Sequence, residues 1–242
     1  MENTGHISLS RQLALQRELD IVANNLANLN TNGYRGERLA FVEYLQKTKT
    51  GDEFTFVQGI ATVRDLSEGQ KIATHNDLDL AIEGEGYFEL ETENGLAYTR
   101  DGAFRLNSES ELVTRQGHRV LGEGDAPIVL SQVEGPISVS EDGIISSGNG
   151  PIGQVKVVRF EDERALVKMS GGLYDSDGQL PEDAENFALL QGYVEGSNIT
   201  GIVELTRMMQ VVQNYSAASD LIDQEHQRQR RALDILGARS FS

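Results

Sequence analysis

The chain has 242 residues, long enough to bury a hydrophobic core in one or two domains, and a formal net charge of −17. It has no cysteine, which excludes disulfides, thiolate nucleophiles and thiolate metal sites, and its acidity argues against binding to nucleic acid. No stretch approaches the roughly 18 uninterrupted apolar residues of a membrane span, and residues 1–30 lack the features of a secretory signal peptide, so any export is expected to use another route.

The net charge lies entirely in the middle of the chain. Residues 1–36 carry three acidic and three basic side chains, and residues 197–242 carry five of each. Residues 37–196 carry the other 30 acidic and 13 basic side chains. Neutral, apolar ends can pack together, whereas a strongly acidic middle favours solvent. The simplest arrangement is a core made from both termini with an outward-facing central domain.

Residues 1–36 predict an N-terminal helix with a leucine-rich seam. Its apolar residues alternate at spacings of four and three, as in a coiled coil, at Leu15, Leu19, Val22, Leu26 and Leu29. We expect the helix to end near Asn32-Gly33, because glycine adopts the left-handed conformation at a helix C-terminus without steric cost. A helix with such a seam needs a partner.

Asparagine is unusually frequent at the end of this helix, with five residues in nine: Asn24, Asn25, Asn28, Asn30 and Asn32. Asparagine is a poor helix former unless its amide bonds to neighbouring groups. Two interpretations stay open at this stage, a frayed helix end and a polar contact surface between packed subunits.

Residues 37–75 predict an extended linker region. Glu37–Gln46 is mildly helical, with apolar residues at three-residue spacing. Lys47–Glu53 is typical of an exposed loop, and Phe54–Lys71 alternates weakly, as an extended chain does.

Residues 76–185 predict a β-rich outer domain, since the apolar period changes from 3.6 to 2. Asn94-Gly95 is the strongest hairpin signal, and further Gly-containing turns separate short apolar runs. The expected strands are Leu96–Arg100, Ala103–Leu106, Leu112–Thr114, Arg119–Leu121, Ile128–Leu130, Ile137–Val139, Ile144–Ser146 and Val155–Phe160. We expect an antiparallel domain built from local hairpins, followed by a return linker over 186–196.

Residues 197–242 predict a long C-terminal helix that Asn198 can cap. Its seam contains Leu205, Met208, Val212, Tyr215, Ile222, Leu233 and Leu236, interrupted by polar residues. The predicted fold class is therefore α+β, with the N- and C-terminal helices paired as a coiled-coil core and an inserted, mainly antiparallel β domain.

No residue pattern predicts catalysis or a cofactor. Gly84-Glu85-Gly86 lacks the helix that a dinucleotide loop requires, and Asp175–Gly178 is more typical of a turn than of a calcium loop. The four histidines are scattered without metal-ligand spacing. We therefore expect a protein that is not an enzyme and has no cofactor or metal; a carboxylate-based hydrolase is the enzyme alternative, although no acid pair stands out.

Several blocks resemble the bacterial flagellar rod and hook proteins. ANNLANLNTNGYR at Ala23–Arg35 is similar to the family's N-terminal signature. The similarity continues, in the family's order, through Asp79–Phe88, Tyr98–Phe104, Leu112–Gly122 and Glu195–Leu205. The compact middle most resembles the proximal-rod members, with distal-rod or hook-type members as the alternative.

The resemblance implies a structural subunit that assembles helically, with copies of itself and other rod proteins, into the hollow drive shaft that carries motor torque across the periplasm. It also implies transport by the flagellar type III export apparatus, without a cleaved signal or membrane insertion. A surface fibre with a coiled-coil stalk is the alternative from another class. The residues assigned to assembly are Leu15, Leu19, Val22, Asn24, Asn25, Leu26, Asn28, Leu29, Leu205, Met208, Val212, Tyr215, Ile222, Leu233 and Leu236.

Overall fold

The computed structural model describes residues 2–47, 53–131 and 135–239, and the chain divides into two units. The helical unit comprises Met1–Ala27, Glu37–Val63 and Thr200–Ser242. The β unit comprises Asn28–Gly36 and Arg64–Ile199. The chain therefore passes between the units at four points, and the N-terminal signature itself is split between them.

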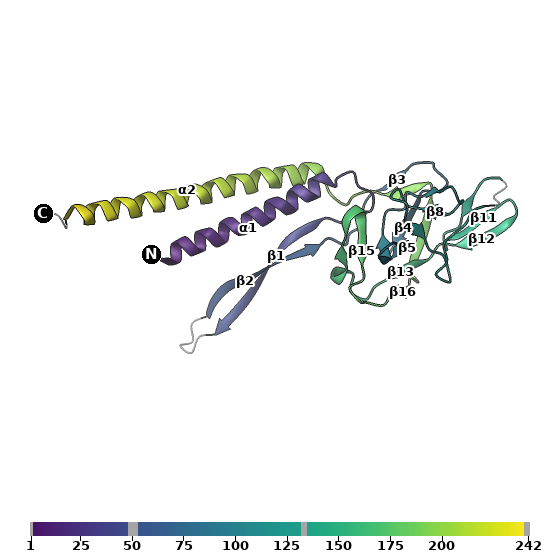
Figure 1. Ribbon diagram of the computed structural model, residues 1–242, viewed down its shortest axis with the longest axis horizontal. Helices are drawn as coiled ribbons and strands as arrows, with labels where there is room; N and C mark the ends of the chain where they lie inside the picture. Colours follow the sequence, from purple (N-terminus) through teal and green to yellow (C-terminus); the bar gives the residue numbers. More distant parts are fainter. Residues whose placement is uncertain (1, 48–52, 132–134, 240–242) are drawn as a thin grey trace. The chain divides into compact units, whose positions relative to one another are not determined.

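The helical unit contains two long helices and a β-ribbon. Its elements are α1 (Glu2–Ala27), β1 (Glu37–Lys47), β2 (Glu53–Arg64) and α2 (Gly201–Arg239). Within this unit α1 and α2 lie side by side, and β1 begins next to α1 (Figure 1). Among the described residues, neither helix has a segment apolar and long enough to cross a membrane.

The segment predicted to be mildly helical, Glu37–Gln46, is a strand, so that prediction is wrong. It pairs with β2, whose sequence EFTFVQGIATVR is rich in β-branched and aromatic residues. Three-residue spacing over one short segment is weak evidence for a helix, and pairing with a strand-forming partner overrides it.

The β unit is built from short antiparallel strands. They are β3 (Lys71–Ala73), β4 (Leu80–Gly84), β5 (Tyr87–Thr92), β6 (Gly95–Thr99), β7 (Arg105–Leu106), β8 (Leu112–Val113), β9 (Arg119–Val120), β10 (Ser138–Val139), β11 (Ile144–Ser147), β12 (Gly150–Gln154), β13 (Val157–Arg159), β14 (Val167–Lys168), β15 (Leu173–Asp175), β16 (Glu182–Asp183), β17 (Phe187–Gln191) and β18 (Tyr193–Glu195). Two 3₁₀ turns, Glu163–Ala165 and Ser170–Gly172, precede β14 and β15.

A nine-stranded sheet forms the centre of the β unit, with the main order β14-β15-β6-β5-β9-β8-β7 and with β13 joining β5 to β16. Separate pairings join β17 to β4, β18 to β3, and β10 through β11 to β12. The hairpin predicted at Asn94-Gly95 is confirmed, since β5 and β6 pair with Thr92 opposite Gly95.

Two hydrophobic cores lie within the β unit. The larger core packs the inward faces of β4, β5, β8, β9 and β17 and includes Ile82, Phe88, Leu90 and Leu189, all 2% exposed or less. The smaller core is aromatic, with the rings of Tyr98 and Phe160 4.7 Å apart at 81°. Edge-to-face pairs of this kind are favoured by the charge distribution of the rings.

The predicted fold class is wrong in its central feature, because it places the core of the protein in a coiled coil of the terminal helices. The described residues contain two α-helices, and the large hydrophobic cores lie in the antiparallel sheets instead. The apolar cluster of α1 and α2 is small and includes Val211 and Ala218, whereas Leu205 and Val212 of the predicted seam are each 45% exposed. Ala218 and Glu204 are buried where α2 contacts α1. A coiled coil requires large apolar side chains at such positions.

Tyr98 makes the stability of the β unit sensitive to alkaline pH. Burial, with the negative charge of Glu89 second, raises the pKa of Tyr98 to about 12. Because the unfolded phenol ionises near about pH 10, the folded state favours the neutral form; its stabilising contribution is complete below that pH and is lost as pH rises towards 12. In a tyrosinate absorbance titration, we expect a step near pH 12 that disappears in Tyr98→Phe. Ionisation of all tyrosines near pH 10 would contradict this.

Candidate assembly site

The contact between α1 and α2 is part apolar and part polar. Leu15 packs with Val211 and Ala218, and Leu19 and Tyr215 lie at the edge of this cluster. The amide of Gln12 donates to the hydroxyl of Tyr215 at 3.1 Å, and Arg207 pairs with Glu18 at 3.0 Å. This contact lies within one chain, so its residues hold the two helices together.

The predicted assembly residues fall into different environments. Leu15 and Val22 are buried, Leu19, Leu26, Leu29, Asn28, Met208, Tyr215 and Ile222 are half-buried, and Asn24, Leu205 and Val212 are exposed. The side chains of Leu233 and Leu236 lie outside the described part of the chain. The structure therefore brings Leu15, Leu19 and Tyr215 together but leaves Leu205 and Val212 facing solvent.

The side chain of Asn25 makes several hydrogen bonds within the helical unit. Its side-chain oxygen accepts from the Glu37 N–H at 3.0 Å, and its amide donates to the Glu37 carbonyl at 2.9 Å. The same amide lies 3.4 Å from a carboxylate oxygen of Glu204. Asn25 is 1% exposed, so this amide joins α1, β1 and α2 and satisfies polar groups that burial would otherwise leave unpaired.

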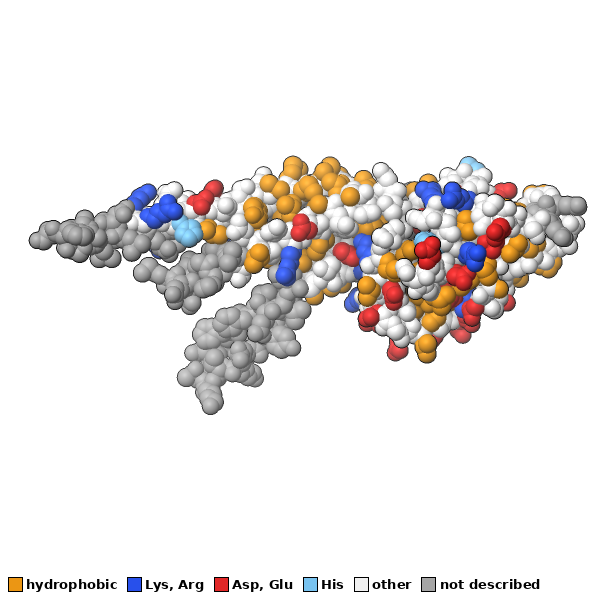
Figure 2. Space-filling model, in the orientation of Figure 1, with side chains coloured by type: hydrophobic (Ala, Val, Ile, Leu, Met, Phe, Trp, Pro, Cys, Tyr) orange, Lys and Arg blue, Asp and Glu red, His pale blue; other side chains and the backbone are white. Residues whose placement is uncertain are grey.

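An apolar face of α2 is open to solvent. Ile202, Leu205, Met209 and Val212 follow one another at spacings of three, four and three, which places them on one side of the helix. They are 71%, 45%, 60% and 45% exposed, and Figure 2 shows hydrophobic side chains gathered over the first half of α2. Adjacent exposed apolar residues of this kind are typical of interaction surfaces, unlike scattered single apolar residues. We call these four residues the open face of α2.

The sequence analysis missed Ile202 and Met209. It followed the apolar row through Met208 and Tyr215, which is rotated around the helix axis from the open face. The spacing that identifies the open face was present in the sequence, but two overlapping apolar rows cannot be ranked by periodicity alone. Contact with α1 decides which row is covered.

The second half of the N-terminal signature belongs to the β unit. The residues from Gly33 to Gly36 are buried, with Arg35 only 3% exposed. The Gly33 N–H donates to the Glu195 carbonyl at 2.8 Å, and the Gly36 N–H donates to the Asn198 side chain at 2.8 Å. The asparagine-rich segment therefore ends in an ordered connection between the signature and the return strand β18.

An ionic cluster holds this connection; Arg35, Arg100 and Glu195 are buried in it, and Glu68 lies at its exposed edge. Glu195 lies 3.0 Å from Nε of Arg100 and 3.6 Å from Nη2 of Arg35. Arg100 also lies 3.9 Å from Glu68 and donates to the carbonyls of Gly86 and Gly84 at 2.6 and 2.9 Å. Glu68 is also paired with Lys71 at 2.8 Å, at the exposed edge of the cluster.

Burial and the neighbouring groups act in opposite directions on the pKa values of two cluster members, Arg100 and Glu68. Burial lowers the pKa of Arg100, while the negative charge of Glu195 opposes this shift. Burial acts to raise the pKa of Glu68, but hydrogen bonds from Lys71 and from the Gly84 N–H lower it below its usual value. A buried ion pair needs such additional hydrogen bonds to offset the loss of hydration.

Gly33 is required where the signature meets the β unit, and Gly33→Ala is expected to destabilise this unit. Its φ is +64°, and an added Cβ would lie 2.5 Å from the carbonyl carbon of Arg100 and 2.7 Å from the Asp101 nitrogen. Left-handed strain alone costs about 1–3 kcal/mol, and the backbone clash adds to it. Chemical denaturation followed by circular dichroism measures the loss.

Gly178→Ala is the matched control, because Gly178 has a φ of +82° but an added Cβ would meet no atom within 4 Å. It isolates the cost of backbone strain. Equal losses of stability in the two variants would show that the close approach of Gly33 to Arg100 does not matter.

In the described part of the chain, no group of three or more His, Asp or Glu side chains is placed to hold a metal ion. Asp175–Gly178 is a turn in which the Asp177 N–H donates to the Asp175 carboxylate at 2.8 Å. The arrangement offers exposed apolar surface on a helix and a rigid, charge-paired connection in the β unit.

Comparison with known proteins finds flagellar families along the chain. The matching families are described as flagella basal body rod protein, over residues 7–35, flagellar hook protein FlgE/F/G D1 domain, over 81–147, and flagellar basal body rod FlgEFG protein C-terminal, over 190–235.

Full-length relatives carry related names. The flagellar basal-body rod protein FlgF of Caulobacter vibrioides is 36% identical and covers 98% of this chain and 99% of its own length. FlgF of Mesorhizobium japonicum is 30% identical over 99% of this chain and 100% of its own length. The flagellar basal-body rod protein FlgG of Bacillus subtilis is 30% identical over 86% of this chain and 89% of its own length.

Proposed function

Because the chain belongs to the family of flagellar basal-body rod proteins, which confirms the resemblance seen in its sequence, we propose that it is a structural subunit of the proximal rod. In this role it assembles with copies of itself and with other rod proteins into the hollow shaft that transmits motor torque. We propose no enzymatic activity.

The open face of α2 is the observation that carries this proposal. Its four large apolar side chains are exposed in the isolated chain, and covering each of them would recover part of the about 1.5–3 kcal/mol that full burial of such a side chain contributes. A rod subunit covers such a face only in the assembled state. Contacts between two different surfaces of neighbouring copies produce an open helical assembly when the rotation between copies does not close into a ring.

The share of this chain that each relative covers supports the proximal position within the rod. The FlgF relatives cover 98–99% of this chain, whereas the FlgG relative of Bacillus subtilis covers 86%. A middle region as compact as that of the FlgF proteins favours this subtype over the distal rod.

The proposal also covers how the chain is exported and which residues contact its partners in the rod. We infer that the chain is transported by the flagellar type III export apparatus and takes its place in the part of the rod that crosses the periplasm. Of the residues assigned to assembly from the sequence, Leu205, Met208, Val212 and Ile222 stay in the proposal as subunit contacts, together with Ile202 and Met209.

Electron microscopy of basal bodies from a strain lacking this gene tests the function. We expect the rod and hook to be missing while the inner-membrane ring persists, and we expect motility to be lost. A plasmid copy of the gene should restore both. Complete basal bodies in the deletion strain would overturn the rod assignment and favour the alternative of a surface fibre.

A further inference from the structure

The chain enters and leaves the β unit through three segments. Residues 28–36 connect to the helical unit at both ends, residues 64–70 contain the end of β2 and the chain that follows it, and residues 195–199 lead to α2. Every covalent path between the two units therefore runs through one of these segments. A force carried along the backbone must pass through them, so the bonds that join the segments decide whether they carry it separately or together.

One side chain, the carboxamide of Asn198 in the third segment, bonds to both other segments. Its oxygen accepts from the Gly36 N–H at 2.8 Å, and its nitrogen donates to the carbonyls of Asp65 and Ser67, both at 3.0 Å. The backbone N–H of Asn198 also donates to the Tyr34 carbonyl at 3.2 Å. An amide side chain offers an acceptor oxygen and two donor hydrogens, and this one uses both kinds of group. We call Gly36, Asp65, Ser67 and Asn198 the Asn198 junction.

Backbone bonds and close packing surround the junction. The Asp65 N–H donates to the Gly36 carbonyl at 2.8 Å, and the Gly69 N–H donates to the Glu195 carboxylate at 3.0 Å. Gly36 is buried, and a side chain added there would overlap Ile199. The three segments are therefore in direct contact where the chain leaves the β unit.

The sequence predicts a different role for Asn198, the cap of α2, and that prediction is wrong. The helix begins at Gly201, and the N–H groups of Val203 and Glu204 donate to the Thr200 carbonyl at 3.0 and 3.1 Å. The Asn198 side chain instead bonds to residues that lie between 131 and 162 positions away in the chain. Asn198 therefore serves a contact between distant segments and not the local start of a helix.

We propose that the Asn198 junction makes the subunit share mechanical load: it holds the three segments together, so that torque passing along the backbone is divided among them. The inference rests on the proposed rod function, because a subunit of a rotating shaft carries such a load. Without the junction, each segment is held only by its remaining bonds and can open separately. Local opening of this kind needs less free energy than unfolding of the whole β unit.

Hydrogen–deuterium exchange of the purified full-length chain tests the junction, with Asn198→Asp as the variant. The change keeps the size of the side chain but replaces its NH₂ group by an oxygen that cannot donate to the carbonyls of Asp65 and Ser67. We expect peptides covering 33–36 and 64–70 to exchange about tenfold faster or more, because polar groups of the junction lose their partners. Asn198→Ala removes the same bonds without adding a charge and should give the same pattern.

Peptides covering β5 and β6 are the internal reference, because these strands lie in the central sheet and outside the junction. Their exchange should not change in either variant. Unchanged exchange at 33–36 and 64–70 would overturn the proposal. Faster exchange of β5 and β6 as well would also overturn it, since Asn198 would then support the whole β unit.

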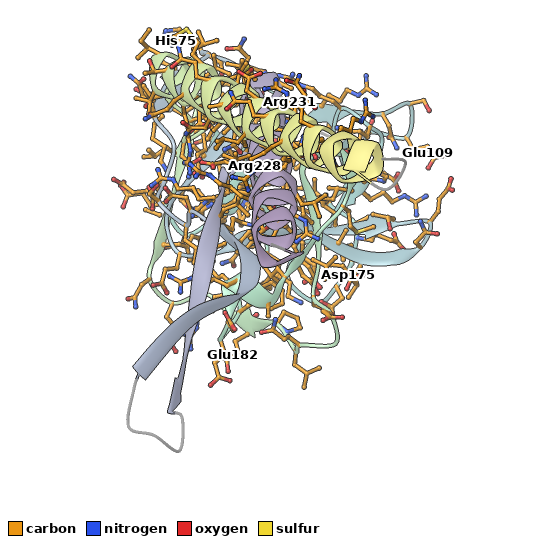
Figure 3. All side chains as sticks on the ribbon, turned by 90° about the vertical axis from the view of Figure 1, so that its left-hand side faces the viewer. His75, Glu109, Asp175, Glu182, Arg228 and Arg231 are labelled. Carbon is orange, nitrogen blue, oxygen red and sulfur yellow. The ribbon has the colours of Figure 1, made fainter. Side chains whose placement is uncertain are left out.

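Asn149→Asp and Glu182→Gln are the matched controls. Asn149 is exposed in the turn between β11 and β12, and its change adds the same charge to the same unit. Glu182 is 57% exposed, and its change weakens a surface pair with Arg159. Figure 3 shows Glu182 at the edge of the β unit, pointing away from it. Neither change should alter the exchange of peptides covering 33–36 and 64–70.

Motility under load supplies the second readout. In a deletion strain complemented with Asn198→Asp, we expect complete basal bodies, since the open face of α2 is unchanged. Swimming speed should fall more steeply than in the Asn149→Asp strain as the viscosity of the medium rises. Missing rods, or the same viscosity dependence in both strains, would overturn the load-sharing role. The deletion strain tests the rod function and exchange tests the junction in the purified chain, so either can fail alone.

Discussion

Glu195→Ala is expected to lower the free energy of unfolding of the β unit by about 3–5 kcal/mol, the usual cost of removing one partner from a buried ion pair. Glu195 is 1% exposed and faces Arg100 and Arg35. It also accepts the Gly69 N–H at 3.0 Å. The substitution leaves two buried guanidinium groups without this carboxylate. Urea denaturation of the full chain, followed by circular dichroism, measures the change.

Glu91→Ala is the matched control for this prediction. Glu91 pairs with Arg119 at 3.3 Å, but both side chains are nearly half exposed. Water screens such a pair, so its loss should change stability by about 0–1 kcal/mol. Glu195→Gln keeps the shape and removes the charge, and should fall between the two. A Glu195→Ala variant no less stable than Glu91→Ala would show that the ionic cluster does not hold the β unit together.

Met209→Asp is expected to abolish incorporation into the rod, and with it motility, while the isolated chain stays folded. Met209 is 60% exposed on the open face of α2, so the change removes little from the core of the chain. The proposed assembly buries the same position, and burying an unpaired carboxylate costs far more than the apolar contact it replaces. Motility of a complemented deletion strain and microscopy of its basal bodies measure the effect.

Asn214→Asp is the matched control for Met209→Asp. Asn214 is exposed on α2, and the change adds the same charge without altering the size of the side chain. At about 100° per residue, it lies on a different side of the helix from Met209. We expect normal motility. A motile Met209→Asp strain with complete basal bodies would remove the open face from the assembly surface.

Circular dichroism and thermal unfolding of the purified Met209→Asp chain separate an assembly defect from a folding defect. Both measurements should match those of the unchanged chain. A lower melting temperature would place Met209 in the fold of the helical unit and would contradict its role as a contact made only on assembly.

The β unit follows from local sequence signals wherever a turn and its flanking strands are close in the chain. Asn94-Gly95 predicts the hairpin, in which Glu93 and Asn94 form the two-residue turn and Gly95 begins β6, and so short a turn fixes the register of β5 and β6. The strand at Ile144–Ser147 follows from the turn at Asp142-Gly143 in the same way. Pairings between distant segments, such as β17 with β4 and β18 with β3, carry no local signal.

The ribbon of β1 and β2 shows where local reasoning fails. Glu37–Gln46 has apolar residues at helical spacing, yet the segment extends because a strand-forming partner lies beside it. The candidate site shows the same limit. Periodicity identifies α2 as a helix with apolar rows, but it does not say which row α1 covers and which stays open.

The sequence by itself determined the family, the presence of the two terminal helices and the hairpins of the β unit, because each depends on short local patterns of residues. The end of the first helix was predicted wrongly, since α1 ends at Ala27 and not near Asn32-Gly33. Only the tertiary structure decided the roles of the charged and polar residues. Arg35 and Glu195 are 160 positions apart and become a buried ion pair only when the return strand β18 meets the signature segment. Long-range packing decides which charged side chains are buried away from water and which apolar helix face stays exposed to it. The spacing of residues along the chain does not determine either outcome.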